Sequence, residues 1–244
     1  MPLEDFNEHG FSGTNGRPSF DDLITKLEAL DYYQELFRFA FLDTEITEER
    51  LQLALAQFTK SIVSFDSKYD TGRAQVANEG DAFPNFTAEE NAGKALFNTP
   101  PPRGGAGCFM CHNPPEFDIS PNVNGHNGIV AEASDPILSD FTNTRAPTLR
   151  DIMKTNGGLN GQLMHNGSKT TLRSVIDHYN NIPVPATEPA RTDFLNNIDR
   201  RLLRMSATPP SLNLSEAEKD QLEAFLQTLS GTNVYVDPKW SNPF

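Results

Sequence analysis

The sequence predicts an all-α fold. Apolar residues recur at steps of three and four over several segments, which is the spacing of amphipathic helices. Two segments match the capping box, in which a Ser or Thr is followed three residues later by Glu. No segment alternates apolar and polar residues as a half-buried strand would. With 244 residues and 17 phenylalanines, the chain can form one large or two small domains with a real core.

Three segments show the helical spacing most clearly. The apolar residues of Phe20–Phe41 predict a helix pair that is broken near Asp31. The same spacing predicts a helix over 47–66 and another from Thr170 to Tyr179.

Capping boxes at Thr87 and Ser215 predict the starts of two further helices, which end near Phe97 and Leu229. Between these helices, residues 98–147 hold many Pro, Gly and Asn residues, and this composition favours turns over regular structure. We therefore expect a long irregular segment there.

Cys108-Phe109-Met110-Cys111-His112 is a C-x-x-C-H motif and uses both cysteines of the chain. This motif is typical of covalent c-type haem attachment, with two thioether bonds and His112 as the proximal iron ligand. A zinc site would need a second ligand pair at suitable spacing, and the sequence has none. A redox-active cysteine pair is expected near a βαβ unit, whereas proline and glycine precede this motif.

A helix before the haem motif, irregular loops after it and a closing helix together predict a cytochrome c-like domain. Covalent haem attachment in bacteria implies export, so we expect a periplasmic or otherwise exported protein whose signal sequence is not in this chain. The net charge of −13 argues against nucleic acid or an anionic membrane as the main partner. No run approaches the roughly 20 apolar residues that a membrane span needs.

Several further motifs occur together with the haem motif. They include Ala146–Arg150, Leu163–Gly167 and His178–Asn180, and upstream the segment Ser64–Asp70. In this order they resemble the C-terminal haem domain of bacterial di-haem cytochrome c peroxidases and the related MauG enzymes, with part of the inter-domain segment.

The resemblance implies three regions. Residues 1–80 correspond to helices of a truncated first haem domain and the inter-domain segment, and residues 81–230 to the C-terminal cytochrome c-like domain. Residues 231–244 correspond to a tail that packs back on the first domain. A second haem c is then expected on an N-terminal region that this chain lacks.

In the family, a glutamate reaches into the distal pocket of that first haem, and the resemblance assigns this role to Glu8. A carboxylate suits the role, because cleavage of the peroxide O–O bond requires a proton to move between the two oxygens.

Met164, His165, His178 and Tyr179 are the candidates for the second axial ligand of the haem on Cys108 and Cys111. The resemblance favours Tyr179, at the position where MauG has a tyrosine. Met164 is the alternative. A phenolate stabilises ferric and higher iron states, whereas a thioether raises the potential.

Other roles also follow from the resemblance. His165 is expected in the haem pocket, and Arg150 is a candidate partner of a haem propionate. Backbone carbonyls of Asn160 and Gln162 are candidate calcium ligands. His126 lies among turn-forming residues, so we expect a solvated loop histidine.

The resemblance implies a haem c-dependent oxidoreductase that uses hydrogen peroxide. Its electron donor would be a small cytochrome or cupredoxin, or its substrate would be another protein, and the family leads us to expect a homodimer. The fragment alone is expected to be incomplete or inactive. The alternative is a single-haem electron-transfer cytochrome, in which residues 1–80 are only a helical extension.

Overall fold

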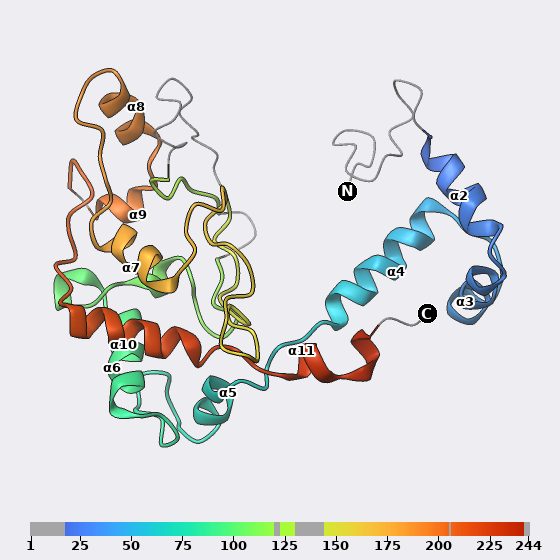
Figure 1. The fold of residues 1–244 in the computed structure, drawn as a ribbon, viewed down its shortest axis with the longest axis horizontal. Coiled ribbons are helices and arrows are strands. Elements are labelled where there is room, and N and C mark those ends of the chain that lie inside the picture. The colour runs from blue at the N-terminus through green and yellow to red at the C-terminus, as the bar shows by residue number, and fades with distance from the viewer. Residues whose placement is uncertain (1–17, 120–122, 130–143, 205, 242–244) are drawn as a thin grey trace. The chain divides into compact units, whose positions relative to one another are not determined.

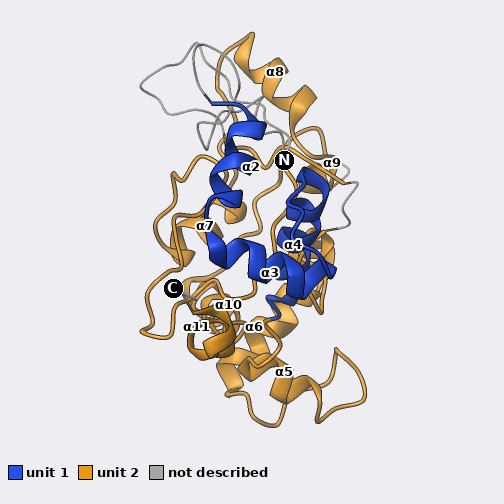
Figure 2. Cartoon of the chain, turned by 90° about the vertical axis from the view of Figure 1, so that its right-hand side faces the viewer, with its two compact units in different colours: residues 1–63 blue, residues 64–244 orange. Residues whose placement is uncertain are grey.

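The structure is a computed structural model that describes residues 18–119, 123–129, 144–204 and 206–241. Two compact units divide the chain, residues 1–63 and residues 64–244 (Figure 2). Glu8 lies outside the described residues.

The described part of the first unit consists of three helices, α2 (Phe20–Glu28), α3 (Asp31–Phe41) and α4 (Glu48–Ser61) (Figure 1). Ser19 and Thr47 cap α2 and α4 with their hydroxyl groups. The expected helix pair broken near Asp31 is present, because the chain turns between α2 and α3. Within this unit the buried apolar side chains are few, and they include Phe37 and Ile46.

The second unit carries the remaining helices, joined by long irregular segments. In chain order they are α5 (Lys68–Arg73), α6 (Ala88–Asn98), η1 (Pro101–Arg103), η2 (Cys108–Met110), α7 (Leu172–Asn180), α8 (Ala190–Asn197), α9 (Arg200–Leu203), α10 (Glu216–Gln227), α11 (Asn233–Val236) and η3 (Pro238–Trp240). The described residues form isolated β-bridges and no extended strand. The all-α prediction is confirmed.

Helices α6 and α10 cross in contact with each other and form the framework of this unit (Figure 1). Each begins at the predicted capping box, at Thr87 and Ser215 respectively. Gly93 permits the close approach of the two helices, because a Cβ atom there would lie 1.9 Å from the carbonyl oxygen of Gln221. The local capping signals thus set where the helices start, and a glycine sets how closely they pack.

Aromatic rings fill the core around α6 and α10. Phe225 of α10 lies with its ring centre 5.1 Å from that of Phe97 of α6, and both rings are buried. Tyr69 of α5 inserts edge-on against Phe117, at 4.8 Å between ring centres. Because Tyr69 belongs to this core, the second unit starts well before residue 81, where the haem domain is expected to begin.

The haem motif lies in the irregular segment directly after α6. Cys108, Phe109 and Met110 form the short helix η2, and the backbone N–H of His112 donates to the Cys108 carbonyl at 2.9 Å. Gly107 precedes η2 with a φ of +69°, and a Cβ atom there would lie 2.7 Å from Cδ of Pro101. Glycine is therefore required both by the left-handed backbone and by the contact with Pro101.

Candidate haem site

A cavity of about 400 Å³ lies beside the haem motif. Cys108, Cys111 and His112 all line this space, which we call the motif cavity. Most of its wall is apolar, with contributions from α6, α7 and α10 that include Phe97, Ile176 and Leu222. A concave apolar space with a few polar groups is the usual form of a cofactor site.

The ring of His112 is held by the protein backbone through Nδ1. This nitrogen lies 3.1 Å from the carbonyl oxygen of Phe117 and 3.0 Å from that of Pro147. Both partners are acceptors only, so Nδ1 carries the proton and donates it. Nε2 is then the nitrogen with a free lone pair. Burial lowers the pKa of His112, which favours the neutral ring that binds metal.

The two thiols are not activated. Burial raises the pKa of Cys108 to about 12 and also raises the pKa of Cys111. The two cysteines form no disulfide with each other. Reactive or redox-active cysteines have lowered pKa values, so these two thiols do not have the character of a catalytic pair.

Three of the four candidate distal ligands line the motif cavity, namely Met164, His165 and Tyr179. The ring of His178 is buried instead, and its Nε2 lies 2.9 Å from the carbonyl oxygen of Asn127. That nitrogen is therefore the donor of a hydrogen bond that ties α7 to the loop at Asn127. The structure removes His178 from the set of ligands.

Asn127 connects the two favoured ligands. Its side-chain amide donates to the sulfur of Met164 at 3.5 Å and also hydrogen-bonds Tyr179. Burial raises the pKa of Tyr179, the nearby Cys111 adds to this effect, and the hydrogen bond from Asn127 opposes it. Without a bound metal the phenol therefore stays protonated at neutral pH.

The expectation for His126 is wrong. Its side chain is 0% exposed and lines the motif cavity. Nδ1 accepts from the backbone N–H of Gly128 at 3.1 Å, and the ring meets that of Phe194 edge-on. The turn-forming neighbours describe the local backbone correctly, but the segment packs against Ile198 and its histidine points inward.

Cationic side chains also reach the cavity wall, and two of them have carboxylate partners. Arg201 binds Asp199, with Nε 2.9 Å from Oδ1, and Arg145 binds Asp118. Arg204 lines the same cavity, and its Nη1 is buried with no hydrogen-bond partner in the described part of the chain. The cavity thus combines two free thiols, an imidazole held by backbone carbonyls, apolar walls and a guanidinium whose Nη1 has no partner in the described chain. These features fit a haem c with its two carboxylates.

Comparison with known proteins agrees with this site. Residues 1–77 match the family model of the di-haem cytochrome c peroxidases. The chain is 28% identical over 216 residues to the methylamine utilization protein MauG of Methylophilus methylotrophus, covering 86% of this chain and 55% of that protein. These matches support a relationship of the chain to the di-haem cytochrome c peroxidase and MauG family. The chain spans about half the length of the curated relatives that it matches.

A further relative is named as a peroxidase, and a solved structure is described as MauG-like. A protein named cytochrome-c peroxidase IdrP1 of Denitromonas iodatirespirans is 26% identical over 226 residues, covering 76% of this chain and 51% of that one. Among solved structures, a MauG-like protein associated with microbial copper homeostasis matches with a TM-score of 0.63 at 24% identity. That match covers 91% of this chain and 65% of the other, and it supports the fold.

Arg150 does not line the motif cavity. Its guanidinium binds the Asp70 carboxylate through two contacts of 2.9 Å, and its remaining donors bind the carbonyl oxygens of Ser64 and Pro115. The group also lies 4.0 Å over the ring of Phe65. All three of its nitrogens donate hydrogen bonds to these partners, so the structure gives Arg150 an architectural role rather than a place beside a propionate.

The two candidate calcium ligands have different surroundings. Asn160 is exposed and donates from its side chain to the hydroxyl of Tyr235 at 2.6 Å, whereas Gln162 lines the motif cavity. The described residues contain no group of three or more His, Cys, Asp or Glu that could hold a metal ion. Calcium binding through backbone carbonyls stays a prediction.

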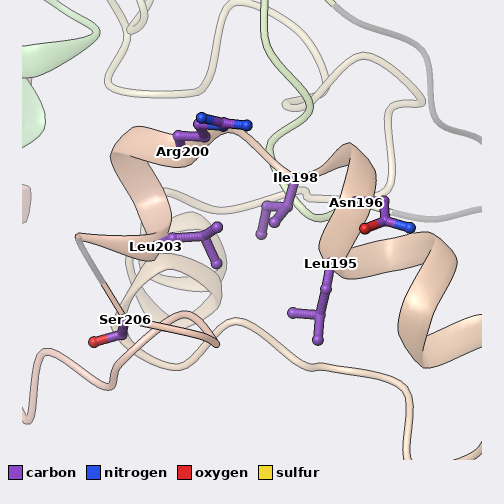
Figure 3. Close-up of a pocket in the computed structure, with 6 residues that line it drawn as sticks. All are labelled: Leu195, Asn196, Ile198, Arg200, Leu203 and Ser206. Atoms are coloured by element: carbon purple, nitrogen blue, oxygen red, sulfur yellow. The ribbon is translucent and has the colours of Figure 1, made fainter.

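A second pocket of about 500 Å³ lies at α8 and α9 (Figure 3). The apolar side chains of Ile198 and Leu203 face each other in it, and Asn196, Arg200 and Ser206 contribute polar groups. None of these groups is a haem anchor or a candidate axial ligand, so this pocket adds nothing to the haem chemistry.

Sequence reasoning missed several cavity residues, among them Asn127, Arg201 and Arg204. A signal for the arginines was present, because Arg200, Arg201 and Arg204 form a basic cluster in a chain with 20 basic and 33 acidic residues. Nothing in the local sequence distinguishes Asn127 from the other asparagines of the loops. Among the described residues, no helix is both long and apolar enough to cross a membrane.

Proposed function

We propose that this chain is the electron-transfer half of a haem c-dependent oxidoreductase of the di-haem peroxidase and MauG type, which uses hydrogen peroxide. The observation that carries the proposal is the motif cavity. It joins the C-x-x-C-H motif to an imidazole with a free Nε2 and to the candidate ligands Tyr179 and Met164. A bound haem supplies one-electron chemistry at its iron.

The residues of the cavity then have separate roles. Cys108 and Cys111 would hold the porphyrin through thioether bonds, and the carbonyl oxygens of Phe117 and Pro147 orient His112, whose Nε2 would bind the iron. Tyr179 is proposed as the distal ligand, with Met164 as the alternative. The apolar wall excludes water, which limits side reactions at the metal.

A second haem c is proposed for the first domain of the complete protein, where Glu8 would move a proton between the two oxygens of peroxide. The electron donor is proposed to be a small cytochrome or cupredoxin, or the substrate to be another protein. Haem maturation implies a periplasmic or otherwise exported location.

Haem counting and peroxide turnover test the proposal. The gene product is purified from a haem-maturing host, its covalent haems are counted by intact mass, and peroxide consumption with a reduced small cytochrome is measured. Two haems with turnover that is lost in Glu8→Gln support the proposal. One haem without turnover, but with rapid electron exchange, would leave an electron-transfer cytochrome.

Paired substitutions decide the distal ligand. Tyr179→Phe should open the sixth coordination position and shift the ferric spectrum from low to high spin, whereas Met164→Leu should leave the spectrum unchanged. The opposite pattern would transfer the role to Met164. Asn127→Ala serves as a further variant, because it removes the hydrogen bonds to both side chains without removing either ligand.

A further inference from the structure

Arg204 is a charged side chain that the proposed roles do not use. It directly follows α9, adopts a left-handed conformation with a φ of +50°, and its backbone N–H donates to the carbonyl oxygen of Arg200 at 3.3 Å. Left-handed backbone is unfavourable for a residue with a Cβ atom. The strained turn leaves Arg204 in the wall of the motif cavity, together with Cys108 and Tyr179.

The charge of Arg204 is not compensated by the described part of the chain. Nη1 is buried and has no hydrogen-bond partner there, and no carboxylate described lies within ion-pair distance. The two other arginines of the cavity wall have such partners, since Arg201 binds Asp199 and Arg145 binds Asp118. Burial lowers the pKa of Arg204, yet a guanidinium remains charged at neutral pH.

A guanidinium nitrogen that is buried without a partner is destabilising, so a ligand of the cavity should supply the missing anion. A carboxylate suits a guanidinium best, because its two oxygens match the planar fork of N–H donors. The lining already contains the haem anchors, and haem carries two carboxylates on its propionate side chains. The unpaired cation and the haem motif therefore meet in one cavity.

We propose that Arg204 binds a haem propionate and thereby sets the reduction potential of this haem. The proposal rests on the proposed haem c function. The role expected for Arg150 thus belongs to Arg204, since the donors of Arg150 are used by Asp70 and by backbone carbonyls. Loss of the guanidinium leaves the propionate charge uncompensated, and this negative charge favours ferric over ferrous iron.

Redox titration of the haem-loaded chain tests this assignment. In Arg204→Gln the ferric-to-ferrous equilibrium should shift at least tenfold towards ferric iron, a drop of about 59 mV for a one-electron couple. Arg204→Lys keeps the positive charge but lacks the planar pair of N–H donors, and its reduction potential should lie close to that of wild type. Arg173→Gln is the matched control, because Arg173 pairs with Glu216 and Asp220 and does not line the cavity.

The outcomes separate this inference from the proposed function. Intact mass and the ferric spectrum are recorded for every variant, so the haem content and axial ligands are known before the potentials are compared. A chain with one thioether-bound haem and equal potentials in Arg204→Gln, Arg173→Gln and wild type overturns the role of Arg204 alone. A chain that acquires no haem in a maturing host overturns the proposed function and this inference together.

Discussion

The second unit contains a packed region and a hollow region, and the two are built differently. The core around Phe225 and Phe97 consists of aromatic rings in direct contact, and each of these side chains is almost fully buried. The motif cavity is lined largely by partly buried residues and retains a cation without a partner. The packed region is complete without a ligand, whereas the hollow region has the shape and charge of a site that a cofactor completes.

Phe117 connects the two regions. Its ring is buried in the aromatic core against Tyr69, while its backbone carbonyl accepts the hydrogen bond from Nδ1 of His112. The packed region therefore orients the candidate iron ligand through one residue. A residue of the aromatic core thus holds the candidate ligand in a fixed orientation, although the ligand lies in an irregular segment.

Removal of both thiols should have the largest effect, because it empties the hollow region. In Cys108→Ser/Cys111→Ser we expect no covalent haem and a fall in unfolding free energy larger than the roughly 3–5 kcal/mol of a large core truncation. Intact mass and denaturant unfolding measure these losses. Met110→Ala, in the same motif, should keep its haem. Equal stability of the haem-free and haem-bound chains would mean that the cavity is stable when empty.

Truncation of the packed region should follow in size. Phe225→Ala should lower the unfolding free energy by about 3–5 kcal/mol, because the ring is fully buried and four aromatic neighbours surround it. Phe39→Ala, at a side chain 90% exposed in the first unit, should change it by less than about 0.5 kcal/mol.

Phe117→Ala tests the link between the two regions, because it should lower the unfolding free energy as much as Phe225→Ala and also perturb the haem spectrum through His112. Circular dichroism follows the stability and Soret absorption follows the iron ligation. Identical Soret spectra in the Phe117 and Phe225 variants would show that Phe117 does not transmit the packing of the core to His112.

Asp70→Asn tests the ion pair that fixes the start of the second unit. Burial raises the pKa of Asp70, but hydrogen bonds from Arg150 and Ser67 outweigh this effect, and the net pKa lies below its ordinary value. The carboxylate therefore stabilises the fold above the unfolded pKa of about 3.9, and this contribution is lost as pH falls through the folded value. We expect a loss of about 3 kcal/mol at pH 7, since the variant leaves Arg150 buried without its partner.

The difference in unfolding free energy between wild type and Asp70→Asn should shrink below about pH 4, because protonated Asp70 no longer pairs with Arg150. Urea titrations at pH 7, 5 and 3 measure it. A difference that stays constant across this range would assign the loss to packing instead of charge.

The helix cap of α6 should give the smallest effect. Thr87→Ala removes the hydroxyl that accepts the Glu90 N–H at 3.1 Å, and we expect a loss of about 1 kcal/mol in unfolding free energy. Thr87→Ser retains the hydroxyl and should remain within about 0.5 kcal/mol of wild type. Equal losses in both variants would show that packing of the threonine methyl group, rather than the cap, matters at this position.

Local signals in the sequence were sufficient for the helices and for the haem motif. The capping boxes at Thr87 and Ser215 act over three residues, and the break near Asp31 lies within one apolar pattern, so neither depends on distant parts of the chain. Long-range packing was not readable in this way, which is why His126 was expected in solvent and why α8 and α9 were not predicted.

Sequence alone was enough to identify the C-x-x-C-H motif and the capping boxes where α6 and α10 begin, because covalent chemistry and capping depend on near neighbours. The tertiary structure decided that Arg150 pairs with Asp70, that His178 is not at the cavity, and that Arg204 faces it without a partner. These assignments join residues far apart in the chain. Burial and charge pairing at such distances depend on the packing of the whole unit, which no local pattern specifies.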